Sequence, residues 1–187
     1  MNNLFQNKYR VTSTRLQWHE YDGGAYFVTV CTGGKIHYFG EIADGEIKMT
    51  AIGQYAHDNL QNITAHYPYA EIPMFVVMPN HVHAIIFINS TKLVNKPQRR
   101  HVLVEPRRAT ALQRRMTDIA NMQGWLSVVV GGFKSAITKY ARQHGLQFAW
   151  QPRFYDHVIR NHHEINRIAE YIGNNVTRWD LDELNGE

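Results

Sequence analysis

The sequence has almost no cysteine and no long apolar run. Cys31 is the single cysteine among 187 residues, which excludes an internal disulfide and a multi-cysteine zinc site. The longest apolar runs, residues 75–78 and 84–88, are far too short to cross a bilayer. The first ten residues contain no apolar stretch of signal-peptide length. We therefore expect a soluble protein of the reducing cytosol that has no membrane partner.

Net charge is also low outside a single segment. The formal net charge is only +4, but residues 92–122 contain eight basic and two acidic side chains. This segment therefore carries a net charge of +6, and the rest of the chain carries −2. Clustered basic residues favour a polyanionic partner, most often nucleic acid. A solvated surface loop explains the same cluster equally well.

The apolar content is sufficient for one folded domain. Apolar residues make up 44% of the chain and aromatic residues 12%, and the length matches that of one domain. We expect residues 1–187 to form a single domain with a basic, flexible insertion at about residues 92–122. Pro97, Pro106 and the lack of an apolar period favour a long loop there, with a short helix from about Ala109.

The order of the predicted elements indicates a fold class. Alternating apolar residues predict strands at residues 26–32, 71–78, 81–89 and 153–160. Helices are predicted at about residues 50–66, with Thr50 as N-cap, at 126–143 and at 164–174. Asp44-Gly45 predicts a hairpin turn within residues 35–49. Apart from this hairpin, the order predicts an α+β, ferredoxin-like (RRM-like) split βαβ fold with an antiparallel sheet and an added C-terminal helix.

The segment Met-Pro-Asn-His-Val-His, residues 78–83, contains two candidate metal ligands. Side chains alternate along a strand, so His81 and His83 emerge on the same face. Two imidazoles at this spacing can supply two ligands of a divalent metal. A His-x-His pair in a chain with 11 histidines can also be structural.

A second stretch, residues 150–160 (WQPRFYDHVIR), is followed by residues 168–175 (IAEYIGNN). Together with the histidine segment, these motifs closely resemble the single-tyrosine HUH transposases. The nearest branch is that of the REP-associated tyrosine transposases (IS200-like transposases). The resemblance covers roughly residues 21–89 and 128–177.

The resemblance implies a metal-dependent single-stranded DNA endonuclease and strand transferase. His81 and His83 match the histidines that bind Mg²⁺ or Mn²⁺, and the metal polarises the scissile phosphate. Tyr171 matches the nucleophile that forms a covalent 5′-phosphotyrosine, and Asn175 matches the polar residue that completes the metal shell. The family commonly continues with Asn-Pro, whereas this chain has Asn175-Val176, which leaves the placement of Asn175 open.

The residues around Tyr171 are consistent with these roles. Tyr171 and Asn175 stand four residues apart and so share one helical face with Arg167. A tyrosine is a weak nucleophile at neutral pH, and we expect Arg167 and the metal to lower its pKa. Tyr171 could instead be a helix residue that only reaches solvent. Tyr140 and Tyr155 are rival nucleophiles, although the first lies on a basic helix and the second is predicted to pack on a strand.

The family's substrate is single-stranded hairpin DNA, and the chain offers basic and aromatic side chains for it. Trp125, Trp150 and Tyr155 could stack on unpaired bases or pack in the core. The candidate DNA-binding residues are Arg167, Lys134, Lys139, Arg142, Arg153, Arg160, Arg107, Arg108, Arg114 and Arg115.

Two other functions remain open. A domesticated hairpin-binding protein without cleavage activity would not need the full set of His81, His83, Tyr171 and Asn175. A metal-dependent hydrolase that uses water as nucleophile would not need Tyr171. The resemblance further implies a prokaryotic cytoplasmic location, nucleoid-associated when bound to DNA, and leaves both a homodimer and a monomer open.

Overall fold

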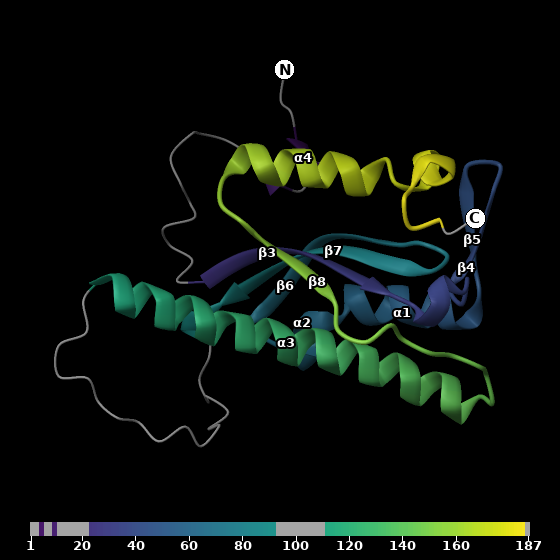
Figure 1. Cartoon of the computed structure of the whole chain (residues 1–187), viewed down its shortest axis with the longest axis horizontal. Coiled ribbons are helices and arrows are strands. Elements are labelled where there is room, and N and C mark those ends of the chain that lie inside the picture. The colour runs from purple at the N-terminus through teal and green to yellow at the C-terminus, as the bar shows by residue number, and fades with distance from the viewer. Residues whose placement is uncertain (1–3, 6–8, 11–22, 93–110, 186–187) are drawn as a thin grey trace.

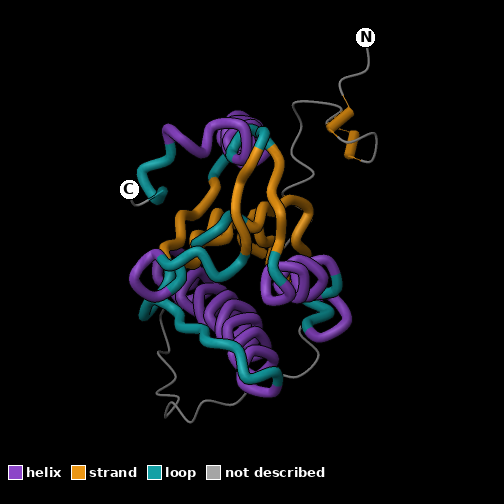
Figure 2. The backbone as a smooth tube through the Cα atoms, turned by 90° about the vertical axis from the view of Figure 1, so that its right-hand side faces the viewer, coloured by secondary structure: helices purple, strands orange, loops and turns teal. Residues whose placement is uncertain are grey.

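The protein has three layers, with one antiparallel sheet between helices on both faces (Figures 1 and 2). The computed structural model describes residues 4–5, 9–10, 23–92 and 111–185. Helices α1 (Ala51–Gln61), α2 (Ile63–His66) and α3 (Ala111–Gln143) lie on one face of the sheet. Helix α4 (His162–Gly173) lies on the other face.

The central sheet has the strand order β6-β7-β3-β8, and every neighbouring pair is antiparallel. Its strands are β3 (Gly23–Cys31), β6 (Ala70–Val77), β7 (His81–Asn89) and β8 (Tyr155–Ile159). Numbered in chain order, this is the 2-3-1-4 arrangement of a split βαβ fold. The predicted ferredoxin-like fold with an added C-terminal helix is therefore confirmed.

Two further pairs of strands stand apart from the central sheet. β4 (Gly40–Ala43) and β5 (Glu46–Met49) form the predicted hairpin. Its turn residues Asp44 and Gly45 both have positive φ angles, 55° and 77°, as a two-residue hairpin turn requires. β1 (Leu4–Phe5) pairs with β2 (Tyr9–Arg10). The short 3-10 helices are η2 (Gly33–Lys35), η3 (Ser90–Lys92) and η4 (Val176–Leu181).

The helices largely follow the sequence signals. The hydroxyl of Thr50 accepts a hydrogen bond from the Gly53 amide, as predicted for the N-cap of α1. The predicted loop at residues 92–122 is wrong for residues 111–122. The short helix predicted from about Ala109 is instead the start of α3, one continuous helix from Ala111 to Gln143. The segment from Ala111 is rich in alanine, leucine, glutamine, arginine and methionine, which favour a helix without an apolar period. Residues 93–110 of the predicted insertion lie outside the described residues.

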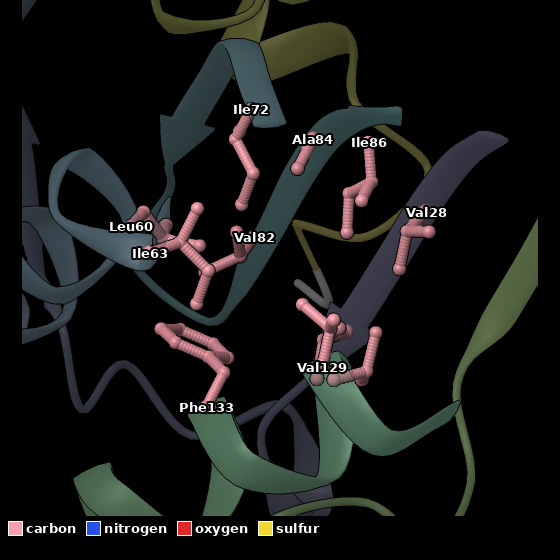
Figure 3. A pocket seen from close by; sticks show the side chains of 11 residues that line it. Val28, Leu60, Ile63, Ile72, Val82, Ala84, Ile86, Val129 and Phe133 are labelled. Atoms are coloured by element: carbon pink, nitrogen blue, oxygen red, sulfur yellow. The ribbon is translucent and has the colours of Figure 1, made fainter. Parts of the chain in front are cut away.

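The main core lies between the sheet and helices α1, α2 and α3. Val28, Ile86, Leu60 and Val129 belong to its apolar clusters, together with Phe133. The side chains drawn in Figure 3 line a small void. Its volume is about 10 Å³. It has room for about one water molecule and an apolar lining, so it is a packing defect rather than a ligand site.

A second core fixes α4 on the opposite face. Ile168, Ala169 and Ile172 of α4 pack against Met74 and Ile85 of the sheet. Asn161 caps the helix by accepting a hydrogen bond from the Glu164 amide. Ile168, Ala169 and Ile172 therefore form the docking face of α4, and the opposite side of the helix faces solvent. Among the helices of the described residues, none combines the length and hydropathy that a membrane span needs.

Candidate active site

The two histidines of the His-x-His pair lie at the start of β7, on the sheet face that α4 covers. Their side chains are 0% and 2% exposed, and their ring centroids are 4.4 Å apart. The prediction that His81 and His83 share one face is confirmed. The face is more deeply buried than alternation alone indicates, because Trp179 of η4 packs beside His81 and Tyr171 of α4 beside His83.

Each histidine is held through its Nδ1 atom by a neighbouring polar side chain. Asn80 Oδ1 lies 2.8 Å from His81 Nδ1, and Thr29 Oγ1 lies 2.9 Å from His83 Nδ1. The Asn80 amide nitrogen faces the carbonyl oxygens of Lys35 and Leu184, so its oxygen faces the ring. An amide oxygen only accepts, so His81 Nδ1 donates and Nε2 keeps its lone pair.

Tyr171 brings a hydroxyl group to the histidine pair. Its Oη lies 3.1 Å from His83 Nε2. Phe27 packs against both residues, with ring centroids 5.2 Å from His83 and 6.1 Å from Tyr171. The Tyr171 side chain is 45% exposed, so its hydroxyl joins a buried cluster while the ring remains accessible to a substrate. Both partners of this contact belong to the same chain.

Asp182 is a member of the cluster that sequence reasoning missed. One ligand atom from each of His81, His83 and Asp182 lies within 4.8 Å of the others, and Asp182 Oδ2 is 3.8 Å from His81 Nε2. Asp182 follows η4, about 100 residues after the histidines, and no motif marks it. Its position depends on the C-terminal segment, which Asn80 and Lys35 hold through the carbonyl oxygens of Leu184 and Glu183.

Asn175 lies at the same cluster but faces Asp182. It is 3% exposed, and its Nδ2 donates to Asp182 Oδ2 at 3.2 Å. It does not cap α4, since Asn174 occupies the C-cap.

The donor set fits a divalent cation. His81 Nε2 and Asn175 Oδ1 are buried side-chain atoms without a hydrogen-bond partner, and an unpaired buried polar atom is costly unless a ligand satisfies it. The cluster therefore offers two imidazole nitrogens, one carboxylate and one amide oxygen. Nitrogen and oxygen donors of this kind suit Mn²⁺ and, less well, Mg²⁺.

The pKa values of the histidines favour metal binding. Burial lowers the pKa of His81 and that of His83 from 6.5 to about 3, and the positive charge that His81 would carry lowers the pKa of His83 further. Both rings are therefore neutral at physiological pH, which is the form that binds a metal.

The pKa of Tyr171 does not follow the expectation from the sequence. Burial and then the negative charge of Asp182 raise it above its ordinary value of 10, and a hydrogen bond from Asn175 only partly offsets this rise. The expected pKa-lowering role of Arg167 is not seen. Its side chain is 79% exposed and lies 4.0 Å from Glu164.

The candidate DNA-binding residues fall on two sides of the sheet. Lys134, Lys139 and Arg142 line one open groove of about 530 Å³ along α3. This groove lies across the sheet from α4, which carries Arg167. Arg153 and Arg160 are exposed on either side of β8. Arg114 and Arg115 lie in α3, but their side chains are outside the described part of the chain, as are Arg107 and Arg108 entirely.

The rival aromatic residues have different environments. Tyr140 of α3 stacks on Tyr55 of α1 with ring centroids 4.1 Å apart. Both helices lie on the sheet face opposite α4. Trp125 packs against Tyr69, and Trp150 packs in the core and donates to the Lys134 carbonyl oxygen. Tyr155 was expected to pack on its strand, but its side chain is 58% exposed, because β8 is an edge strand.

Comparisons with known proteins find one relative in sequence and several similar solved structures. An uncharacterized protein of Haemophilus influenzae (strain ATCC 51907 / DSM 11121 / KW20 / Rd) is 32% identical over 174 residues, which cover 92% of this chain and 91% of that protein. A REP-associated tyrosine transposase bound to a REP hairpin matches with 19% identity, 92% coverage of this chain, 77% coverage of that chain and a TM-score of 0.48. A candidate transposase of Deinococcus radiodurans R1 matches with 16% identity, 89% and 97% coverage, and a TM-score of 0.37.

No family model matches the sequence. With 32% identity over nearly its whole length, the chain belongs to one family with the Haemophilus influenzae protein, and its motifs resemble those of the single-tyrosine HUH transposases.

Proposed function

We propose that the chain cleaves and rejoins single-stranded hairpin DNA through a covalent 5′-phosphotyrosine on Tyr171. The observation that carries this proposal is the 3.1 Å contact between Tyr171 Oη and His83 Nε2. It joins an accessible tyrosine hydroxyl to a buried cluster of side chains that could bind a metal, an arrangement that a purely structural tyrosine does not need.

The reaction exchanges one phosphoester for another. Tyr171 Oη forms a bond to the phosphorus atom, the bond from phosphorus to O3′ breaks, and the 3′ oxygen leaves as a hydroxyl. The 5′ end stays attached to the tyrosine, so that a 3′ hydroxyl can reverse the step and rejoin a strand. The free energy of the phosphoester is kept, and no other energy source is required.

The residues of the chain position the nucleophile and supply charge. Ile168, Ala169 and Ile172 dock α4 on the sheet, which fixes Tyr171 over His83 and reduces the entropy cost of attack. His81, His83 and Asp182, with Asn175 beside them, would hold Mg²⁺ or Mn²⁺. When bound, the cation would polarise the scissile phosphate and stabilise negative charge on the leaving oxygen.

The phenol must lose its proton as it attacks, and Asp182 opposes this loss. Burial and then the carboxylate of Asp182 raise the pKa of Tyr171, so the protein without a cation keeps the phenol protonated at neutral pH. We therefore expect activity to depend strictly on a divalent cation, because the cation would neutralise the charge of Asp182.

The DNA partner is proposed from the motifs and from the basic side chains. Lys139 and Arg142 of the α3 groove are exposed and would contact phosphates. Lys134 has less freedom, because its Nζ donates to the carbonyl oxygens of Gln151 and Arg153 at 2.8 and 2.9 Å. We infer that Arg153, Arg160 and Arg167 contact the part of the DNA that lies near Tyr171. A cytoplasmic, nucleoid-associated location would follow from this DNA partner.

A covalent-adduct assay tests the proposal. The protein is incubated with Mn²⁺ and end-labelled single-stranded oligonucleotides that carry a hairpin with randomised flanks, and it is then denatured. We expect a labelled protein band that Tyr171→Phe abolishes and that Tyr140→Phe, the matched control at a rival tyrosine that stacks on Tyr55, retains. Binding without cleavage would instead support a hairpin-binding protein, and cleavage without an adduct would support a hydrolase that uses water.

A further inference from the structure

The exposed tyrosine at the start of β8 lies in the same row of the sheet as the histidine cluster. We propose that Tyr155 is a stacking platform for an unpaired base of the single strand next to the scissile phosphate. This inference rests on the proposed function and adds a substrate subsite to it.

Strand register places this tyrosine beside the active site. Thr29 of β3 pairs with His83 on β7 and with Tyr155 on β8. Directly paired residues of an antiparallel sheet project to the same face. Neighbouring strands are separated by about 4.8 Å, so the Tyr155 backbone lies roughly 10 Å from that of His83. A short stretch of single-stranded DNA can span this distance.

Helix α4 covers the rest of this face of β8 but leaves Tyr155 open. Ile159 is buried in the core beneath α4, and His157 Nε2 lies 2.7 Å from Glu164 Oε1 of α4. Tyr155 is the third residue of this alternating set, and it is 58% exposed. The open side of the cluster therefore presents two accessible phenol rings, Tyr155 and the 45% exposed Tyr171.

The segment that leads to Tyr155 is held rigidly. The Gln151 amide donates to the Cys31 carbonyl oxygen at 2.9 Å, and Trp150 forms an isolated bridge with Thr32. Lys134 Nζ donates to the carbonyl oxygens of Gln151 and Arg153. These contacts stabilise the left-handed backbone of Arg153, whose φ is 67°, an uncommon conformation for a residue with a side chain. Tyr155 is therefore preorganised, which lowers the entropy cost of stacking.

Charge favours nucleic acid over a protein chain at this edge. Arg153 precedes β8 and Arg160 follows it, and both are exposed. Cations at both ends of an exposed edge strand suit a phosphate backbone that runs past an aromatic ring. Stacking on such rings is tolerant of base identity and contributes strongly to the binding of single strands.

Binding measurements in a cleavage-deficient background test the subsite. All proteins carry Tyr171→Phe, and binding to a labelled hairpin with single-stranded tails on both sides is followed by fluorescence anisotropy. Tyr155→Ala is compared with Tyr155→Phe and Tyr155→Trp, which keep a stacking surface. Leu146→Ala, which removes another exposed apolar side chain, is the matched control. Each protein is also measured with tails that contain one abasic site, moved one position at a time.

We expect Tyr155→Ala to weaken binding roughly 5- to 100-fold, whereas the Phe, Trp and Leu146→Ala variants bind like the parent. One abasic position should cause a similar loss in the parent and no further loss in Tyr155→Ala. Unchanged binding of Tyr155→Ala, or losses that add at every abasic position, would overturn the inference. So would a Tyr155→Ala effect on oligomeric state alone, since β8 would then be an interface between copies. If the folded parent binds no single-stranded DNA, the proposed function itself fails.

Discussion

Acidification is expected to destabilise the fold through the two buried histidines of the candidate active site. Burial lowers the pKa of His81 and of His83 from 6.5 to about 3. The unfolded chain therefore takes up protons below pH 6.5, while the folded protein takes them up only near pH 3. Stability is thus full above about pH 6.5 and falls as the pH decreases from there toward 3.

The size of the effect follows from linkage. At pH 5 each histidine of the unfolded chain is protonated and each histidine of the folded chain is neutral. This difference costs about 2 kcal/mol per histidine relative to pH 7.5, or about 4 kcal/mol for both. Such a loss is a large part of the stability of a typical domain.

Urea unfolding at pH 7.5, 6 and 5, without added metal, measures this effect. In His81→Gln and in His83→Gln, which cannot titrate, the loss between pH 7.5 and 5 should shrink by about 2 kcal/mol. His163→Gln, which replaces an exposed histidine, should keep the full loss. The reasoning is refuted if all three variants show the pH dependence of the parent.

Three further predictions concern packing and metal binding. Gly53→Ala should destabilise the protein by at least about 2 kcal/mol in urea unfolding, because an added Cβ would clash with the backbone carbonyl oxygen of Phe39. Gly131→Ala in α3, where an added Cβ meets nothing within 4 Å, should instead stabilise the protein by about 1 kcal/mol. Ile172→Ala, at a site 2% exposed, should cost about 2–5 kcal/mol and loosen α4, and an unchanged midpoint would contradict the docking role. Asp182→Asn should weaken Mn²⁺ binding, measured by electron paramagnetic resonance, at least about tenfold, whereas the exposed Asp180→Asn should leave it unchanged; equal affinities would remove Asp182 from the site.

Local patterns in the sequence predicted most of the elements. Alternating apolar residues located the four strands of the sheet, and Thr50 and Asp44-Gly45 marked a helix start and a hairpin turn that the structure contains. The helix from about Ala109 was predicted to be short because the prediction relied on apolar periodicity, whereas α3 runs without a break from Ala111 to Gln143. A helix that begins outside such a period is revealed by intrinsic propensity instead, which the segment after Ala111 has.

The cluster of the candidate active site was only partly predictable. His81, His83 and Tyr171 belong to motifs, and the structure brings their side chains together. Asp182 belongs to no motif, and tertiary contacts of the C-terminal segment with Asn80 and Lys35 place it at the cluster. Without Asp182, the raised pKa of Tyr171 could not be foreseen either, since the negative charge of Asp182 is one of its causes.

The central claim is that Tyr171 becomes covalently attached to DNA, and peptide mass spectrometry tests it most directly. The protein is incubated with Mn²⁺ and the hairpin oligonucleotides, treated with nuclease and digested with trypsin. We predict a phosphonucleotide on Tyr171, within the tryptic peptide of residues 168–178, and its absence when Mn²⁺ is omitted. Cleaved DNA with an unmodified Tyr171, or a modified Tyr140 or Tyr155 in its place, would contradict the account.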